Sequence, residues 1–553
     1  MTMQRSTISS LRRLAAIGAV AVGAIGLAAC SSSPGGGSST PTGSSAPVTN
    51  ALATGCSLPG SGGSPTGHTL NLSFFMDPGQ PPDPDIFYSG QGLILTTNMY
   101  EGLLQYAPGT ATPTLEPSLA TKWTVSPDKK TYTFTLRQGV TFHDGTPFTA
   151  AAIKPSFDRR TAVNQGPAYM VAGVASVTTS GKYQATITLK KSNSAFLTYL
   201  ASAYGPKMMS PTALAANKGS DNDQKYLTTH DVGTGPYMLT KAEVNIGYEL
   251  KAYPGYWGPK PYFTTVELPV IDSSSTVQAQ FKTGQLAAIL HDIPSSAVKS
   301  YLGDKNVDSC TQPSMISQYF YVSPHRGMLT SATDRLALLK AIDVNALTQG
   351  AYYGRGSTAT QLYPANMMPA QFAKQDVPYD PSILKGIVAG LPAGEKSLTI
   401  GYDSSQPDAQ IVATLISSQL DTAGLNVTVT SYPTAELYGW PSDPKSAPDL
   451  LVTPGWPDAS SPYTWGHISF DPGAGLNYTG CSDPATTAEL AAGLVSGSNA
   501  DFSAAAISAE ATGCWENLVN VTDFQVAQPW LKGMASAHVV SDPFTVLLAD
   551  LSA

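Results

Sequence analysis

Few of the residues able to do chemistry in this 553-residue chain stand at the spacings that a catalytic or metal site requires. The seven histidines are spread singly, and the chain has neither the Gly-x-Ser-x-Gly run of many hydrolases nor the zinc motif His-Glu-x-x-His. The chain has no Cys-x-x-Cys pair, the spacing that is typical of a metal or redox site. We therefore expect no catalytic residue, no metal and no cofactor. A triad of distant residues is recognised by geometry alone, so an exported hydrolase stays open as an alternative.

The N-terminal segment has the composition of a secretory signal. Arg12 and Arg13 precede an apolar run over residues 14–29, which ends in small residues and is followed directly by Cys30. This run is too short to cross a bilayer as a mature helix. A Cys in this place resembles the lipobox of bacterial lipoproteins. The resemblance implies that residues 1–29 are a signal peptide and that Cys30 carries a lipid anchor; the alternative is an ordinary signal peptide with a chance Cys.

The next segment, residues 30–66, is rich in Ser, Gly, Pro and Thr and holds no charged residue, which predicts a flexible linker. We expect the protein at the extracytoplasmic face of the bacterial cell membrane. Loss of residues 1–29, which hold three arginines and no acid, takes the net charge from −8 to −11. Such an acidic protein disfavours nucleic acid as a partner.

Four further cysteines remain, and an even number in an exported chain favours two disulfides. Three pairings are open. We favour Cys481–Cys514, which closes a modest loop and leaves Cys56 to pair with Cys310.

Alternation of apolar and polar residues predicts strands near residues 68–72, at 131–136 and at 182–189. A later stretch predicts a parallel βαβ unit: a strand at 398–401, a helix at 408–423 and a strand at 425–429. Parallel sheets bind ligands at the carboxyl ends of their strands. Two α/β regions separated by long segments therefore predict two lobes around a cleft.

An ordered series of short motifs covers most of the chain from residue 70 onward. It consists of residues 100–103 (YEGL), 119–128 (LATKWTVSPD), 132–137 (YTFTLR), 139–145 (GVTFHDG), 232–237 (VGTGPY), 253–258 (YPGYWG), 260–262 (KPY), 335–338 (RLAL) and 341–343 (AID). The series resembles the family 5 extracellular solute-binding proteins, the peptide, dipeptide and nickel binders of ABC importers.

The resemblance implies an α/β chain with the two-lobed, type 2 fold of periplasmic binding proteins, with an extra subdomain in the first lobe and a central ligand cleft. It implies that the first lobe consists of residues 67–105, 231–312 and a C-terminal return over 526–553. It assigns residues 106–230 to the extra subdomain and 313–525 to the second lobe. Ligand binding is then a closure of the two lobes.

The resemblance also indicates candidate ligand-binding residues. Residues 455–462 (GWPDASSP) match a family loop in which an Asp pairs with the ligand's ammonium, and this places Asp458 at that position. The alternative is that Asp458 starts a turn before Pro462. Ala459 replaces the aromatic residue of the motif. Of the aromatic residues nearby, we expect Trp456 and one of Tyr463 and Trp465 to face the cleft.

An early loop offers Tyr88 and Ser89 as a wall of the first lobe, with Phe87 expected in the core. Arg355 and Arg326 are candidates to hold a ligand carboxylate; the alternative for each is a solvated surface charge. His143 belongs to the 139–145 motif and is expected to be structural.

These inferences predict a membrane-anchored solute-binding protein without enzymatic activity. We expect it to capture an oligopeptide or another amine-bearing ligand and to deliver it to the permease of an ABC transporter, as a monomer. The alternatives are a binder of a sugar or metal complex, a surface adhesin, or the exported hydrolase.

Overall fold

The computed structural model describes residues 52–553 apart from 61, 66, 292 and 373–376. The chain divides into two units, Met1–Ser44 and Ser45–Ala553, and all described residues belong to the second. The predicted signal peptide and Cys30 lie outside the described residues. Part of the predicted 30–66 linker is folded, because β1 (Gly55–Ser57) pairs with β13 (Asp308–Gln312).

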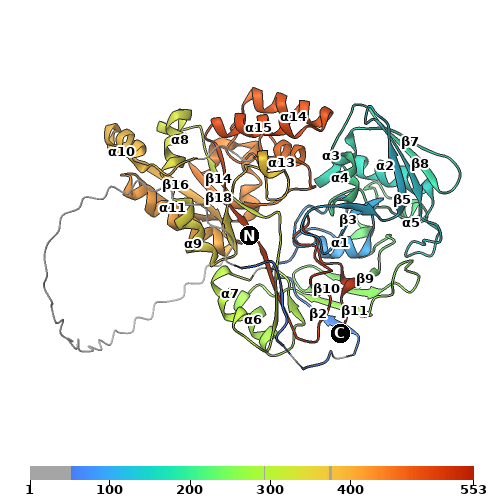
Figure 1. Ribbon diagram of the computed structural model, residues 1–553. Helices are drawn as coiled ribbons and strands as arrows, with labels where there is room; N and C mark the ends of the chain where they lie inside the picture. The colour runs from blue at the N-terminus through green and yellow to red at the C-terminus, as the bar shows by residue number, and fades with distance from the viewer. Residues whose placement is uncertain (1–51, 61, 66, 292, 373–376) are drawn as a thin grey trace, which may run out of the picture. The chain divides into compact units, whose positions relative to one another are not determined.

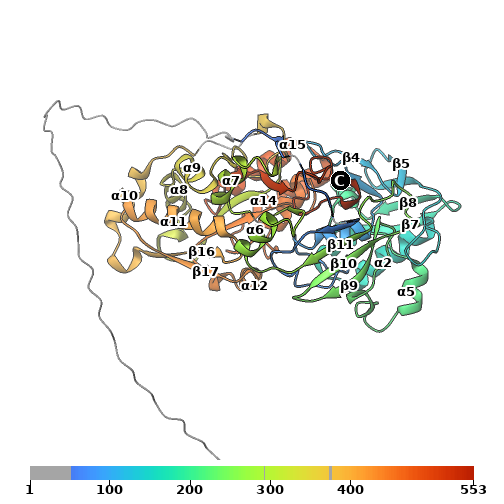
Figure 2. The same cartoon turned by 90° about the horizontal axis from the view of Figure 1, so that it is seen from below.

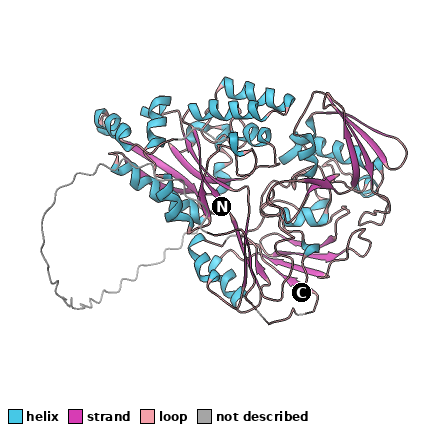
Figure 3. Ribbon diagram, in the orientation of Figure 1, coloured by secondary structure: helices cyan, strands magenta, loops and turns pink. Residues whose placement is uncertain are grey.

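A six-stranded mixed sheet forms the centre of the second lobe (Figures 1 and 3). Its order is β15 (Gly356–Thr358), β19 (Trp515–Val521), β14 (Ser317–Val322), β18 (Leu450–Gly455), β16 (Ser397–Asp403) and β17 (Asn426–Tyr432). Strands β16, β17 and β18 run parallel, and the remaining pairs are antiparallel.

The side chains of β14 alternate between two cores, as the twofold period of a strand requires. Phe320 and Val322 join a cluster covered by α8 (Ala332–Lys340), α9 (Val344–Tyr352), α10 (Pro381–Gly390) and α11 (Pro407–Thr422). Tyr319 and Tyr321 join a cluster on the other face. That face is covered by α12 (Thr434–Leu437), α13 (Pro462–Ser469), α14 (Pro484–Ser496) and α15 (Asn499–Ala511).

The predicted βαβ unit is present as β16, α11 and β17, and Figure 2 shows α11 lying along the two strands. Gly424 follows the helix with a φ of +99°, a backbone conformation that glycine adopts without strain. The buried face of α11 is centred on Val412, Ile416 and Leu420. Ile411 is only half-buried, at the edge of this face.

The first lobe is built on two four-stranded sheets. One has the order β1, β13, β20 (Asp523–Ala527) and β12 (Ala288–Ile289), and packs with α6 (Ser274–Lys282) and α7 (Ser295–Leu302). The other has the order β2 (Thr69–Asn71), β11 (Thr265–Pro269), β10 (Gly247–Ala252) and β9 (Tyr237–Glu243). It packs with α1 (Leu93–Met99), α5 (Pro211–Asn217) and residues of the C-terminal segment, which lies beside β2 and β11 in Figure 1.

The extra subdomain consists of an antiparallel sheet in the order β5 (Ala120–Val125), β6 (Thr131–Leu136), β8 (Gln184–Leu189) and β7 (Val174–Thr179). The sheet packs with α2 (Ile153–Val163), α3 (Tyr169–Ala172), α4 (Phe196–Ala201) and the hairpin of β3 (Leu104–Tyr106) and β4 (Leu115–Pro117). In β6, Tyr132, Phe134 and Leu136 are buried while the threonines between them are not, as the sequence pattern predicts.

The chain passes twice between the sheets of the two lobes. It leaves β13 at Gln312 and enters β14 at Ser317, and it returns from β19 to β20 at Thr522. The second passage lies a few residues before the expected boundary at 525. Both expected disulfides, Cys56–Cys310 and Cys481–Cys514, are present.

Candidate functional site

Asp458 lies in the loop that follows the central strand β18, at the carboxyl end of the parallel part of the sheet, where such sheets bind ligands. The loop spans residues 456–461 and leads into α13, with Pro462 in its first turn. The loop follows Gly455, the last residue of β18, and this position is a glycine because a side chain does not fit there. A Cβ on Gly455 would stand 2.5 Å from the ring of Trp465 and 3.1 Å from that of Tyr319.

The Asp458 carboxylate is buried and joined to two tyrosines from distant segments. The hydroxyls of Tyr88, in the loop before α1, and Tyr169, the first residue of α3, both donate to Oδ2; the Tyr169 bond is 2.8 Å long. Burial raises the pKa of Asp458 to about 6, although these hydrogen bonds and the nearby His467 oppose the shift. An ionised carboxylate in this place is costly without a cationic partner.

Two hydroxyl groups and the apolar core of the extra subdomain hold the loop around Asp458. The Ser202 hydroxyl donates to the Asp458 carbonyl, and the Ser460 amide donates to the hydroxyl of Tyr106 at 3.0 Å. Ala459 is fully buried in the core of that subdomain. The loop therefore belongs by sequence to the second lobe and by contact to the first.

Asp458 opens into a pocket with mostly aromatic walls. The lining residues are Tyr88, Tyr204, Tyr321, Tyr438, Pro454, Gly455, Trp456, Asp458, Leu476 and Tyr478. They come from the first lobe, the extra subdomain and the second lobe. The free volume is about 50 Å³, which is room for a few water molecules. A larger ligand requires the walls to move apart.

The structure brings together three of the predicted residues, Asp458, Trp456 and Tyr88. The indole N–H of Trp456 donates to the Tyr204 hydroxyl at 3.1 Å, and its ring meets Phe544 edge-on with the centroids 4.7 Å apart. Ser89 is half-buried beside Tyr88 and does not line the pocket.

The other two predicted aromatic residues lie elsewhere. Trp465 is fully buried in the core of the second lobe, where it stacks on Tyr319 at 4.5 Å, so the expectation that it faces the cleft does not fit its position. Tyr463 is half-buried, stacks on His467 at 5.2 Å, and is not among the pocket-lining residues. Phe87 is buried in the core, as predicted.

Arg355 lines a neighbouring hollow, but its guanidinium is already bonded to the protein. It donates to the Thr522 carbonyl at 3.1 and 3.3 Å and to the Ile293 carbonyl at 2.9 Å. Thr522 lies where the chain returns from β19 to β20, and Ile293 belongs to the first lobe. The bonds of Arg355 therefore connect the two lobes, so its role is structural. Arg326 is an exposed side chain 3.5 Å from Asp449. His143 is buried against Asp231 and the Gly235 carbonyl, consistent with a structural role.

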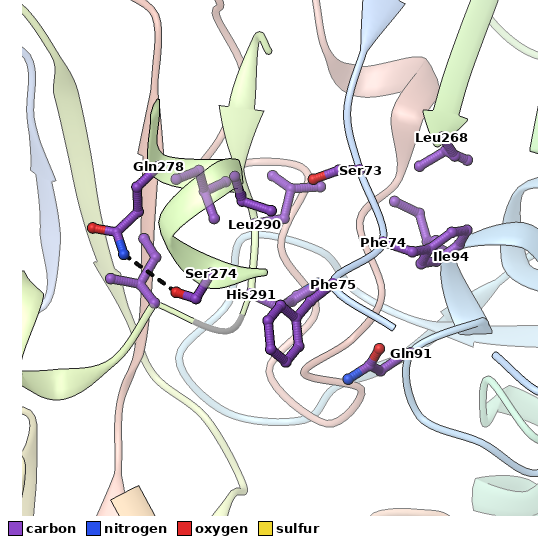
Figure 4. Close-up of a pocket in the computed structure, with 13 residues that line it drawn as sticks. Ser73, Phe74, Phe75, Gln91, Ile94, Leu268, Ser274, Gln278, Leu290 and His291 are labelled. Carbon is purple, nitrogen blue, oxygen red and sulfur yellow. Dashed lines mark hydrogen bonds between the residues drawn. The ribbon is translucent and has the colours of Figure 1, made fainter. Parts of the chain in front are cut away.

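A second hollow lies inside the first lobe, beside Phe74 and Leu268 (Figure 4). Its polar groups include Gln278, whose amide donates to the Ser274 hydroxyl at 3.2 Å, and His291. None of its described lining residues is Asp, Glu, Lys or Arg, and the free volume is about 30 Å³. This hollow is not built to hold a charged solute.

Two features are absent from the described residues. No three His, Cys, Asp or Glu side chains among residues 52–553, with the gaps noted above, are grouped to bind a metal ion. Within the same residues, no helix combines the length and the apolar character needed to cross a membrane.

Sequence reasoning missed Tyr169 and four of the pocket tyrosines, which are Tyr204, Tyr321, Tyr438 and Tyr478. They lie in separate segments, and nothing in their local sequence distinguishes them from core tyrosines. A signal exists only for Tyr321, which stands on β14 beside β18, the strand that leads to Asp458.

With this geometry in place, comparison with known proteins assigns the chain to a family. The model of the bacterial extracellular solute-binding proteins, family 5 (Middle), matches residues 114–476, more than half of the chain. The chain therefore belongs to this family, and its fold is the two-lobed α/β fold of these proteins.

Relatives and a solved structure agree with this assignment. The chain is 25% identical over 391 residues to the "Probable D,D-dipeptide-binding periplasmic protein DdpA" of Escherichia coli, covering 70% of this chain and 75% of that protein. It is 31% identical over 318 residues to the glutathione-binding protein GsiB of Shigella flexneri, covering 57% of this chain and 60% of GsiB. The crystal structure of NikA from Brucella suis in complex with Fe(III)-EDTA superposes with a TM-score of 0.76 at 20% identity, over 88% of this chain and 99% of NikA.

Proposed function

We propose that this protein captures an amine-bearing solute, most favourably an oligopeptide, by closure of its two lobes, and delivers the solute unchanged to an ABC permease. It acts as a binding protein and not as an enzyme. It works at the extracytoplasmic face of the membrane, held there by a lipid on Cys30.

The single observation that carries this proposal is the environment of Asp458. A buried carboxylate with a raised pKa, enclosed by segments of both lobes, is stabilised by a cation that enters the pocket. An ammonium group supplies that charge and up to three N–H donors. Both hydrogen bonds to the carboxylate reach Oδ2, and within the described part of the chain no group donates to Oδ1.

The family supports the same conclusion. Relatives named for D,D-dipeptides and for glutathione bind small molecules made of amino acids. The alternative of a sugar ligand is less favourable, because a neutral sugar leaves the Asp458 charge uncompensated.

Closure follows from the contacts across the site. Tyr88, Tyr169 and Ser202 reach Asp458 from the first lobe and its subdomain. A ligand that bridges Asp458 and these walls stabilises the closed state by its differential contacts.

A thermal-shift screen of the mature protein against pools of di- to pentapeptides, sugars and polyamines tests the proposal. A ligand at 100 times its Kd adds about 2.7 kcal/mol to the free energy of unfolding. We expect stabilisation by peptides with a free N-terminus and none by sugars.

Two variants test whether the stabilisation depends on Asp458. Asp458→Asn should abolish the shift while leaving the fold intact. Asp158→Asn is the matched control, because it removes an exposed carboxylate that forms an ion pair with Lys154 on α2. No stabilisation by any amine, or equal shifts in wild type and Asp458→Asn, would contradict the proposal.

A further inference from the structure

The charged groups around the pocket are negative. Its described lining residues include Asp458 but no Lys, Arg or His. Two further acids act electrostatically on the tyrosines of its walls: Asp403 on Tyr438 and Tyr478, and Asp542 on Tyr204. After burial, which is the largest cause, these carboxylates help to raise the pKa of the tyrosines. The pocket is therefore an environment that favours positive charge.

Among the described residues, the cationic groups close to the site are already bonded to other parts of the protein. The Lys207 ammonium donates to the Ser202 carbonyl at 2.9 Å and interacts with Asp542, and the residue lines a different hollow. His467 stands next to Tyr169 but is bonded to Asp471 at 2.6 Å. In the hollow on the other side of Pro454, the Arg355 guanidinium is bonded to carbonyl groups and faces Asp408 at 4.0 Å.

The walls supply aromatic faces in place of cations. Six of the ten lining residues are Tyr or Trp. An ammonium is attracted to such faces by the negative potential above the ring, most strongly for Trp. An unpaired carboxylate of a ligand would meet the same faces and the same acids unfavourably.

From this arrangement we propose that the described walls of this pocket recognise only the ammonium end of the ligand, by Asp458 together with aromatic faces, and hold no anchor for a ligand carboxylate. The ligand class is an amine on an apolar body, which includes peptides whose C-terminus is blocked or lies far along the chain. This inference rests on the proposed function and narrows it.

Three pools of random tripeptides test the inference: free peptides, their C-terminal amides, and their N-acetyl derivatives. Each pool is dialysed against the mature protein, and the retained peptides are quantified by mass spectrometry. We expect the amides to be retained within about threefold of the free peptides. The N-acetyl pool should be retained at least about 100-fold less.

A loss of tenfold or more on amidation would overturn this inference, since it would show a carboxylate anchor, while the proposed function would stand. Retention of neither the free nor the amidated pool would contradict the proposed function itself and this inference with it.

Variants of one wall residue give an independent readout. Tyr438 is 56% exposed, so its replacement should not disturb the core. We expect Tyr438→Leu to weaken retention of the amide pool about three- to tenfold and Tyr438→Phe to preserve it, because only Phe keeps a ring face. Tyr379→Leu, at a tyrosine 50% exposed and outside the pocket, is the matched control. Equal retention by Tyr438→Leu and wild type would contradict the role of the aromatic faces.

Discussion

Asp458 combines burial with negative charge, two properties that oppose each other in a folded protein. Its two tyrosine partners stabilise the charge by hydrogen bonds without neutralising it. In an unfolded chain the pKa of an Asp is about 3.9, and in this protein it is about 6. The folded protein thus binds the proton more tightly, so this residue lowers stability as the pH rises from about 4 to about 6.

Ligand affinity should rise over the same pH range in which Asp458 lowers the stability of the fold. A cationic amine binds only to the ionised carboxylate, so affinity should rise by up to about tenfold per pH unit until about pH 6. It should then stay level until the α-amino group of a peptide loses its proton near pH 8. Titration calorimetry between pH 4.5 and 8 measures this profile.

The groups that face Asp458 include Tyr88, Tyr169 and the nearest imidazole, His467. The profile is therefore repeated in His467→Gln, where the inflection near pH 6 must persist. Its disappearance there, or a flat profile in wild type, would argue against Asp458 as the titrating group.

Replacement of Tyr169 gives a second test of the Asp458 titration. Its hydroxyl lowers the pKa of Asp458, so Tyr169→Phe should move the inflection of the affinity profile to a higher pH. Tyr199→Phe serves as the control, because this ring packs edge-on against Tyr169, while the hydroxyl bonds to the carboxylate come from Tyr88 and Tyr169. An unshifted inflection in Tyr169→Phe would show that the Tyr169 bond does not stabilise the ionised form.

The element that positions Tyr88 is a loop bound to α2 by buried ion pairs. Arg159 bonds Asp83 and Asp85 at 2.6 to 2.8 Å, and Arg160, which is fully buried, bonds Asp85 at 2.8 Å. Tyr88 follows three residues after Asp85, so these pairs hold the segment from which its hydroxyl reaches Asp458.

Asp85→Ala should lower the free energy of unfolding by about 3–5 kcal/mol, because it leaves two buried guanidinium groups short of a partner. Urea denaturation measures the change. Asp158→Ala on the same helix breaks an exposed pair and should cost at most about 1 kcal/mol. Similar losses in the two variants would mean that the buried pairs do not anchor the loop.

Local patterns predicted many of these elements. The alternation in β6 and the βαβ unit around α11 follow from short-range periodicity, and both are present. The expectation that one of Tyr463 and Trp465 faces the cleft rested on nearness to the Asp458 loop and not on such a pattern, and Trp465 is not that residue. It lies two residues after Tyr463 on α13, a helix we did not predict, so the two side chains point to different faces and Trp465 joins the core.

At the scale of the whole molecule, the site exists only because distant segments meet. Asp458 and Trp456, which the family motif indicated, lie in the loop after β18, but most of the other walls come from separate elements between residues 88 and 478. Whether a tyrosine lines a pocket or fills a core depends on those long-range contacts. That information is absent from the local sequence.

Closure of the two lobes on an ammonium is the central claim, and the carboxyl ¹³C signal of Asp458 tests it most directly. The protein, labelled at Asp, is titrated with and without a peptide obtained from the thermal-shift screen, and Asp458→Asn assigns the signal. We predict an inflection near pH 6 in the free protein that falls below about pH 4 with the peptide bound, and a peptide recovered with unchanged mass. An inflection that the bound peptide leaves in place, or a peptide recovered in altered form, would contradict the account.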